Sequence, residues 1–403
     1  MANTFTPSDV YAIVNAMQQQ MFGSVSLAAV NTTTFATVGE NMLRAGATNT
    51  LDALGIVLGR TTFGVRTYRG KLRIFIETRV EYGGIERKIS FYAKPLSATK
   101  AFNTDLNATT LDDGNSVDHY VISKKYPLEI NFIGQKNEAF DDTTWLVQLR
   151  QAFRSEAEFG QFVAAKLVDI ANDLETKIEA NNRLLLLNAM GATYNVGATR
   201  QKVDLVAAYN AFYGTSKTTA DLLGADFESF IKFFMMRLKG DMELMRERNE
   251  LFHIYPARND DSGNALVLPR HTPPEDRRLI LYMPMIRQAE STVFPSLFND
   301  SYLKLENYEG VEYWQNPATP EGILVTPNQL NTTTGQSEDG NQVALDHVVA
   351  FLYDRDAIEV SLKLESVLTT PINAKGKYFN TCYDWAYNFK CDQTENMVLY
   401  YLP

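Results

Sequence analysis

One segment, Ser155–Met190, constrains the fold of this chain more than any other. Ser155 and Glu158 have the spacing of a capping box, in which each side chain binds the backbone at a helix start. Apolar side chains then recur every three or four residues, the period of one helix face: Phe159, Val163, Leu167, Ile170, Leu174 and Ile178. We predict one helix of about 50 Å, given the ~1.5 Å rise per residue, ending at Gly191. Such a helix serves as a strut on which other elements pack.

A second constraint comes from Leu72–Tyr92, "LRIFIETRVEYGGIERKISFY". Its alternation predicts two antiparallel strands joined at Gly83-Gly84, each roughly 36 Å long. In this register Ile76 faces Phe91 and Ile74 faces Ala93, with most apolar residues on one face and charges on the other. Two strands alone are marginal in water and need a third surface. That surface belongs either to the chain's own sheet or to another copy.

Composition and charge narrow the classes of protein. The 403 residues suffice for two or three domains, and 45% hydrophobic with 21% charged residues indicates a globular fold. The net charge of −10 makes strong phosphate binding a poor fit, although it allows nucleic acid to be enclosed without being gripped. We expect a cytoplasmic chain, because it shows no signal-type leader and no run of ~20 apolar residues.

The rest of the chain reads as a mixture of helices and strands. The start Thr6-Pro7-Ser8-Asp9 predicts a helix that ends at Gly23. Residues 25–63 are weakly patterned and resemble an arm. A further helical block is expected over 219–250 and a helix over 285–297, with a polar loop at 326–342. Strands are expected at 251–255, 266–268, 279–283, 302–308, 311–315, 322–325, 347–353 and 358–364, before a Tyr- and Phe-rich closing segment, 378–401.

No constellation predicts catalytic, cofactor or metal chemistry. The four histidines (His119, His253, His271 and His347) are far apart and lack zinc-ligand spacing. Asp346-His347 could form half of a catalytic triad, but there is no G-x-S-x-G elbow for a nucleophile. Cys382 and Cys391 are expected to be reduced, buried thiols. A soluble enzyme with an unrecognised site stays open as an alternative.

The order of elements resembles that of a known family. The residues that carry the resemblance are "YAIVNAM" (Tyr11–Met17), the strut Ser155–Met190, "VVAFLYDRDAI" (Val348–Ile358) and "KYFNTCYDWAYNFKCDQTENMVLYYL" (Lys377–Leu402). Together they look like the major capsid protein of tailed bacteriophages, close to the head protein of small short-tailed phages. The resemblance implies an α+β fold of the Hong Kong 97 type.

The resemblance also implies a division of the chain. Residues 1–62 would be an N-terminal arm, 63–100 an extended β-hairpin loop, 101–245 the first part of a peripheral domain with the spine helix, 246–344 an axial domain, and 345–403 the closing strands of the peripheral domain. The loop's apolar face would lie on an adjacent subunit. Its candidate inter-subunit contacts are Ile74, Ile76, Val80, Tyr82, Ile89 and Phe91.

The function implied is that of a virion shell protein without catalytic, cofactor or metal residues. Copies would assemble in the host cytoplasm as pentamers and hexamers of an icosahedral shell around double-stranded DNA, without sequence-specific binding and without a membrane. A separate scaffolding protein and a portal protein would be partners. The 20 Tyr and 23 Phe suit large interfaces between subunits. An encapsulin-like compartment shell remains an alternative.

Overall fold

The computed structural model describes residues 7–25, 28–45, 53, 71–76, 86–93, 124–132, 135–148, 156–261, 263–292 and 308–403. The chain divides into two compact units of mixed helix and sheet, each described by itself below. The first unit comprises Met1–Gly84, Gly134–Arg183 and Val360–Phe389. The second comprises Ile85–Ile133, Leu184–Glu359 and Lys390–Pro403.

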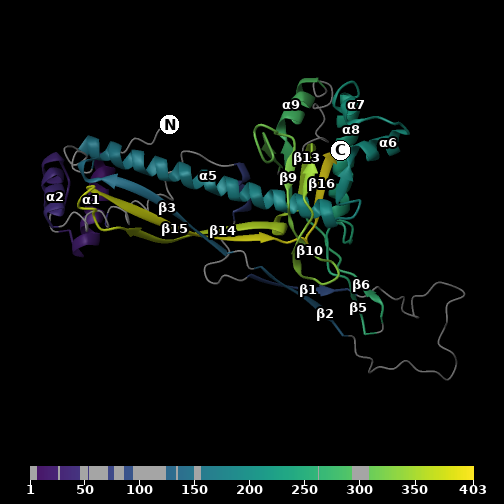
Figure 1. Ribbon diagram of the computed structural model, residues 1–403, viewed down its shortest axis with the longest axis horizontal. Helices are drawn as coiled ribbons and strands as arrows, with labels where there is room; N and C mark the ends of the chain where they lie inside the picture. Colours follow the sequence, from purple (N-terminus) through teal and green to yellow (C-terminus); the bar gives the residue numbers. More distant parts are fainter. Residues whose placement is uncertain are drawn as a thin grey trace, which may run out of the picture. The chain divides into compact units, whose positions relative to one another are not determined.

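The predicted strut is the long helix α5 (Glu156–Val196), which has 41 residues and runs beside β3, β14 and β15 (Figure 1). In the first unit its apolar stripe buries Ile170, Leu174 and Ile178 against Tyr383, Trp385 and Tyr387. Phe159 is also buried, whereas the side chains of Val163 and Leu167 lie outside the described residues. The predicted stripe is therefore confirmed at four of its six positions.

A three-stranded sheet forms the other side of this core. Its order is β14 (Ile358–Thr369), β15 (Tyr378–Cys391) and β3 (Gln135–Trp145). The β15 and β3 strands are antiparallel, from Tyr378 opposite Trp145 to Asn388 opposite Gln135. Alternate residues of β15 are buried, and its large aromatic side chains pack on α5. This is the one-faced burial expected of an antiparallel sheet covered on one side.

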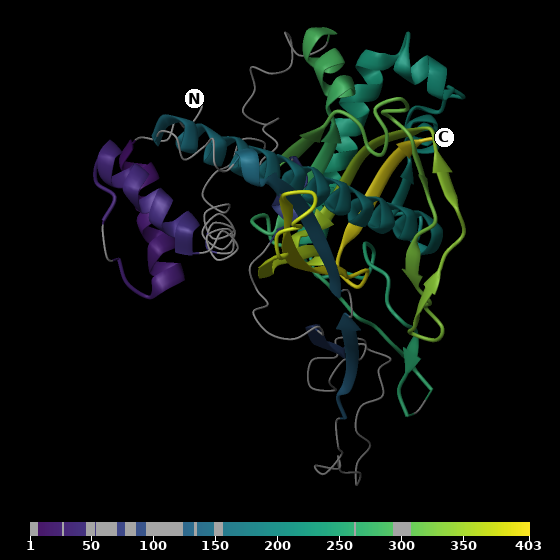
Figure 2. The same cartoon turned by 60° about the vertical axis from the view of Figure 1, so that its left-hand side comes forward.

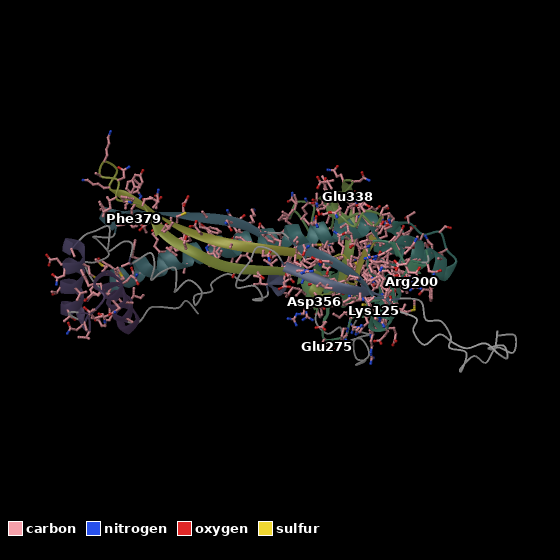
Figure 3. All side chains as sticks on the ribbon, turned by 90° about the horizontal axis from the view of Figure 1, so that it is seen from below. Lys125, Arg200, Glu275, Glu338, Asp356 and Phe379 are labelled. Atoms are coloured by element: carbon pink, nitrogen blue, oxygen red, sulfur yellow. The ribbon has the colours of Figure 1, made fainter. Side chains whose placement is uncertain are left out.

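Two N-terminal helices build a second core in the first unit. α1 (Pro7–Phe22) follows the predicted bounds, and Gly23 after it adopts a positive φ of 69°. α2 (Thr32–Ala45), which falls in a stretch with no predicted helix, packs Phe35 on Phe159 of α5 with ring centroids 5.6 Å apart. Phe379, labelled in Figure 3, joins this cluster from the start of β15.

The second unit is built on a five-stranded sheet, seen from two sides in Figures 1 and 2. Its order is β4 (Lys202–Asp204), β16 (Met397–Leu402), β13 (His347–Asp354), β7 (Arg277–Tyr282) and β8 (Tyr308–Val311). The central strand β13 is antiparallel to both neighbours, while β4 and β8 run parallel to theirs. Because β13 is covered on both faces, seven of its eight residues are buried.

Helices and short strands complete this unit. The helices are α6 (Leu205–Tyr213), α7 (Thr219–Leu223), α8 (Phe227–Arg246) and α9 (Met283–Thr292), with the 3-10 turn η4 (Arg355–Ala357). The predicted block 219–250 thus breaks at Gly224, between α7 and α8. The short strands are β5 (Arg258–Asn259), β6 (Ala265–Leu266), β9 (Ile323–Val325), β10 (Asn328–Leu330), β11 (Ser337–Asp339) and β12 (Val343–Leu345). The predicted polar loop therefore contains the β10–β11 hairpin.

The two-stranded ribbon corrects the predicted hairpin. Strand β1 (Glu86–Tyr92) pairs antiparallel with β2 (Tyr126–Phe132), so Phe91 lies opposite Pro127 and not opposite Ile76. Ile76 instead forms a parallel bridge with Val360, and Ala93, predicted opposite Ile74, bridges Val267. The predicted turn at Gly83-Gly84 lies outside the described residues.

The physical reason for this difference lies in the residues before Ile76. The segment Lys71–Phe75 forms a 3-10 turn, η1, and not a strand. Two polar side chains of α5 hold its backbone: Glu179 accepts a hydrogen bond from the Leu72 amide at 3.0 Å, and Asn182 donates one to the Leu72 carbonyl at 2.9 Å. These two bonds satisfy the backbone of Leu72 without a strand partner.

Gly191 does not end α5 as predicted, and its environment explains why a glycine stands there. A Cβ at this position would lie 2.8 Å from Val325 Cγ1 and 3.1 Å from Pro327. The close approach of the β9–β10 turn, and not helix termination, therefore requires glycine at this position.

Two helical glycines provide a matched test of this packing. We expect Gly191→Ala to lower the free energy of unfolding by about 1–3 kcal/mol, the usual cost of overpacking. Gly240 in α8 has no atom within 4 Å of its Cβ position, so Gly240→Ala should raise the same free energy by up to about 1 kcal/mol through helix propensity. Urea denaturation of both variants measures the pair. Equal effects at the two sites would contradict the close approach at Gly191.

Candidate functional site

The two faces of β1 differ in what they meet. Alternation along the strand turns Arg87, Ile89 and Phe91 to one face, here the outer face, and Glu86, Lys88, Ser90 and Tyr92 to the other, the inner face. Ile89 is 51% exposed and Phe91 is 57% exposed. Two of the three charged residues of β1, Glu86 and Lys88, thus lie inside, and the large apolar side chains Ile89 and Phe91 lie outside, the reverse of what solvent alone would favour.

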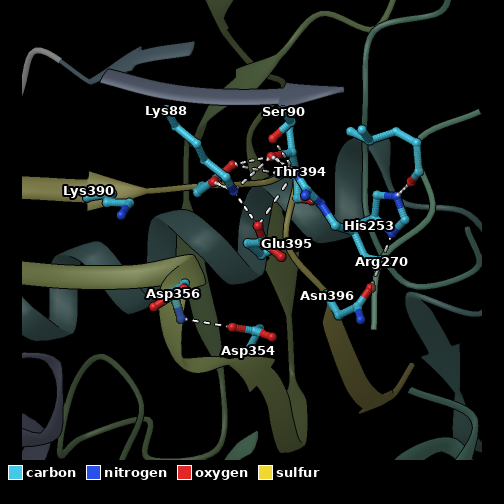
Figure 4. A network of polar contacts seen from close by, with 12 residues as sticks. Lys88, Ser90, His253, Arg270, Asp354, Asp356, Lys390, Thr394, Glu395 and Asn396 are labelled. Carbon is cyan, nitrogen blue, oxygen red and sulfur yellow. Dashed lines mark hydrogen bonds and ion pairs between the residues drawn. The ribbon is translucent and has the colours of Figure 1, made fainter. Parts of the chain in front are cut away.

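Ionic contacts hold the inner face against the turn between β15 and β16 (Figure 4). The Lys88 ammonium group forms ion pairs with Asp392 and Glu395. Two residues earlier, Glu86 accepts a hydrogen bond at 2.7 Å from Nζ of Lys390, at the end of β15, and the same nitrogen lies 3.3 Å from Glu359. The signs alternate on both partners, so each charge of β1 meets its opposite.

The turn that receives β1 is buried although it is polar. Five turn residues lie among the buried side chains, as does Lys390 at the end of β15. The five are Asp392, Gln393, Thr394, Glu395 and Asn396. Asp392 accepts hydrogen bonds from the amide and the hydroxyl of Thr394, at 2.9 and 2.6 Å. Arg270 donates to the Thr394 carbonyl and to the Ser90 hydroxyl, both at 2.9 Å. These bonds meet the requirement that buried polar groups have partners.

Burial sets the ionisation of this network. Burial raises the pKa of the Glu395 carboxyl, although Lys88 and Arg270 lower it. Burial alone would lower the pKa of Lys390, but Glu86 and Glu359 raise it above its ordinary value. Because the folded state holds the Glu395 proton more tightly than the unfolded chain does, ionising this carboxyl costs folding free energy as the pH rises.

Farther along β1, the inner face becomes apolar. Tyr92 packs with Tyr126, Leu266 and Leu268 in one buried cluster. The Tyr92 hydroxyl donates a hydrogen bond to the Pro256 carbonyl at 2.7 Å. The ribbon is therefore anchored in the second unit by charges at one end of β1 and by an aromatic cluster at the other.

The six predicted contact residues divide into three groups. Ile89 and Phe91 lie together on the outer face beside Pro127, next to the exposed ion pair of Arg87 and Glu129 at 2.7 Å. Ile74 and Ile76 are half-buried, and Ile76 packs against the aromatic cluster on α5 of its own chain. Val80 and Tyr82 lie outside the described residues. The anchoring charges on the inner face were not predicted, although the sequence alternation of Glu86 and Lys88 signals them.

The groups considered for chemistry remain dispersed. Within the described parts of the chain, no three His, Cys, Asp or Glu side chains come together as a metal site. His347 pairs with Glu321 at 2.5 Å. A hydrogen bond with Asp141, followed by burial, raises the pKa of the Cys382 thiol to about 12, and burial raises that of Cys391 to about 12. Both free thiols are therefore protonated at neutral pH. No described helix is long and apolar enough to cross a membrane.

Solved structures identify the class of protein that has this fold. A capsid structure of Staphylococcus phage Andhra overlays with a TM-score of 0.52 at 8% identity, over 84% of this chain and 86% of that chain. A structure of the head fiber and inner core protein of bacteriophage P68 gives 0.44 at 9% identity, over 84% and 86%. The capsid of cyanophage P-SCSP1u gives 0.42 at 12%, over 84% and 89%. The likeness to the Andhra capsid shows that the fold is that of phage capsid proteins.

Sequence comparison then gives the family. Residues 12–401 match the family described as Phi29-like phage major capsid protein. The chain belongs to this family and is a structural protein of the phage head shell. No curated protein sequence matches the chain. The predicted resemblance to phage major capsid proteins is confirmed.

Acid should destabilise the fold through His253, which is buried behind the turn. Burial lowers the pKa of His253 to about 4, although its ring nitrogens face the oxygens of Leu268 and Asn396. A lowered histidine pKa gives stability that is present above the unfolded value of about 6.5 and is lost as the pH falls toward 4. The loss should reach about 3 kcal/mol at ~1.4 kcal/mol per pKa unit.

The measurement is the free energy of unfolding between pH 7 and pH 4. We expect His253→Gln to flatten this profile, because the amide does not titrate. A wild-type slope retained in His253→Gln would show that other groups cause the acid loss.

Proposed function

We propose that copies of this capsid protein assemble as pentamers and hexamers into an icosahedral shell around double-stranded DNA. Family membership supports assembly from many copies. The net charge of −10 fits a wall that encloses DNA without gripping it or reading its sequence. Assembly in the host cytoplasm with a separate scaffolding protein and a portal protein belongs to the same proposal.

The single observation that carries the proposal is the exposed apolar outer face of β1. Ile89 and Phe91 are more than half exposed, and Pro127 lies beside them on β2. Exposed apolar patches mark interaction sites on soluble proteins, and apolar and aromatic side chains dominate the centres of obligate interfaces. We propose that this outer face lies against a neighbouring subunit, which supplies the third surface that a two-stranded ribbon needs.

The structure supports the other four predicted contact residues to different degrees. Val80 and Tyr82 remain candidates from the sequence. Ile74 and Ile76 are half-buried, and Ile76 already packs within its own unit. We therefore expect Ile76 to contribute more to the stability of the subunit than to contacts between subunits.

A Hong Kong 97-type division of labour is also proposed. Residues 1–62 would form the arm, 63–100 the extended loop, 101–245 and 345–403 the peripheral domain, and 246–344 the axial domain. The pairing of β1 with β2 suggests that the extended loop continues to Phe132. The long helix α5, packed on the β14–β15–β3 sheet, has the length and core expected of the peripheral spine.

The two alternative functions are less well supported. An encapsulin-like compartment shell would share the capsid fold, but the match to a phage capsid family over residues 12–401 favours the phage head. An enzyme would need a site for its chemistry, and the Asp346-His347 pair has its histidine ring bound to Glu321. We propose no catalytic role.

Replacing the outer-face residues tests the proposal. We expect Ile89→Asp and Phe91→Asp to leave the subunit folded, because both side chains are exposed, and to block assembly, because each places an unpaired charge at the interface. Loss of one central contact costs about 2 kcal/mol or more, repeated at every copy. Sedimentation and negative-stain microscopy measure the assembled fraction, and urea denaturation measures the subunit.

Two control variants sharpen this test. Phe212 on α6 is also 57% exposed, so Phe212→Asp matches the chemistry outside the proposed contact and should assemble normally. Ile76→Asp should instead lower the free energy of unfolding of the subunit. The proposal fails if Phe91→Asp forms shells like the wild type, or if it unfolds the subunit as Ile76→Asp does.

A further inference from the structure

The sequence of β1 allows two orientations, and the structure holds one of them. A shift of one residue in a strand exchanges its two faces. For β1 such a shift would turn Ile89 and Phe91 inward, together with Arg87, and release Glu86 and Lys88 to solvent. Burying the two apolar side chains and hydrating the two charges is what solvent alone favours. Something on the inner face must therefore select the observed register.

The ionic contacts of the inner face have this selectivity. If the strand moved so that each residue took the place of the one before it, Arg87 would meet Lys390 and Ile89 would meet Asp392 and Glu395. Both contacts would be unfavourable, since a like-charge pair repels and the buried acids would lose the Lys88 cation.

A shift in the other direction, in which each residue takes the place of the one after it, disturbs different contacts. Arg87 could then replace Lys88 beside the acids, but an apolar residue, Ile85, would replace Glu86 beside Lys390. Lys390 is only 6% exposed and would keep a single carboxylate partner, Glu359. Ser90 would also lose the hydrogen bond that Arg270 donates at 2.9 Å. The Glu86–Lys390 pair therefore opposes both shifts, and the Lys88 pairs with Asp392 and Glu395 add to the barrier against the first.

We infer that the pairs Glu86–Lys390 and Lys88–Asp392/Glu395 form a register lock that keeps the apolar outer face of β1 available to a second copy of this chain. Lys88 and Lys390 are then positioning residues for the contact surface, and they act through the strand without touching the neighbour. The inference rests on the proposed function for the meaning of that surface, but the lock itself is a property of the single subunit.

Stability alone does not explain this network. Burial raises the pKa of Glu395, which means that the fold loses free energy when this carboxyl ionises. Buried ion pairs are often no more stabilising than apolar residues of similar size, and their best-attested use is to fix one register among several. The opposite charges of Glu86 and Lys88 have this pattern, because Glu86 meets Lys390 of β15 and Lys88 meets the two acids of the turn.

Thiol labelling of unassembled subunits tests the lock. Ile89→Cys reports on the outer face and Ser90→Cys on the inner face. The native thiols, with pKa values of about 12, react slowly at pH 8 because the thiolate is the reactive form, and mass spectrometry separates the sites. With the lock intact, Cys at 89 should label at least about tenfold faster than Cys at 90, a rate ratio that corresponds to a free-energy difference of about 1.4 kcal/mol.

The decisive variant removes four charges of the lock. Arg270 then loses the Glu395 carboxylate 3.6 Å away but keeps its hydrogen bond to the Thr394 carbonyl. Glu86→Gln, Lys88→Met, Asp392→Asn and Glu395→Gln together leave Lys390 with Glu359, and the labelling ratio should fall toward one. Lys88→Arg should keep the wild-type ratio. The double variant Arg87→Met and Glu129→Gln removes the exposed ion pair of the same ribbon, and it should also keep the wild-type labelling ratio. An unchanged ratio in the fourfold variant overturns the inference.

A second variant decides the matter if the fourfold variant does not fold. Glu86→Lys places a like charge beside Lys390, at a side chain that is 26% exposed. This change should lower the labelling ratio at least about threefold. An unchanged ratio would overturn the lock. Because labelling uses single subunits, it separates the two proposals. If the labelling ratio refutes the lock but Phe91→Asp still blocks assembly, the proposed contact surface stands. If the ratio supports the lock but Phe91→Asp assembles normally, the lock stands and the contact surface is refuted.

Discussion

The burial of charge on one face of β1 is the constraint from which the proposed role of this capsid protein follows. Glu86 and Lys88 meet opposite charges of a buried polar turn, and strand alternation then leaves Ile89 and Phe91 outside. A chain that completed its own fold would be expected to bury these two side chains and expose the charges. The ribbon is thus well anchored on one face and open on the other, as expected of a subunit that buries more surface in an assembly.

Each of the two compact units holds one part of the segment that was predicted as a hairpin. In the first unit, α5 and the aromatic residues of β15 form a core, and Glu179 and Asn182 hold the backbone of Leu72. In the second unit, Lys390 at the end of β15 holds Glu86, and the turn between β15 and β16 holds Lys88. Buried polar side chains do the anchoring in both places. Such contacts are directional, so they fix where a strand begins and which way it faces.

Regular sequence patterns within single helices and strands made much of the fold predictable. The apolar stripe of α5, the Pro7 start of α1 and the continuous apolar run of β13 each specify one structure. The partner of β1 was not predictable in this way. The Gly83-Gly84 pair favoured a local hairpin, whereas the structure pairs β1 with a strand that begins at Tyr126. The prediction that Gly191 ends α5 was wrong for the same reason, because the role of this glycine depends on Val325 and Pro327 far along the chain. For the candidate site, alternation predicted that Ile89 and Phe91 share a face, but the buried acids that orient this face lie some 300 residues away in sequence.

The most direct test of the account is a high-resolution electron cryomicroscopy structure of the assembled shell. The quantity to measure is the exposure of Ile89 and Phe91 in the particle, against 51% and 57% in the single chain. The account predicts that both side chains become buried against residues of a neighbouring subunit while Lys88 keeps its contacts with Asp392 and Glu395. Side chains that stay open to solvent in the shell, or that are covered by their own subunit, would contradict it.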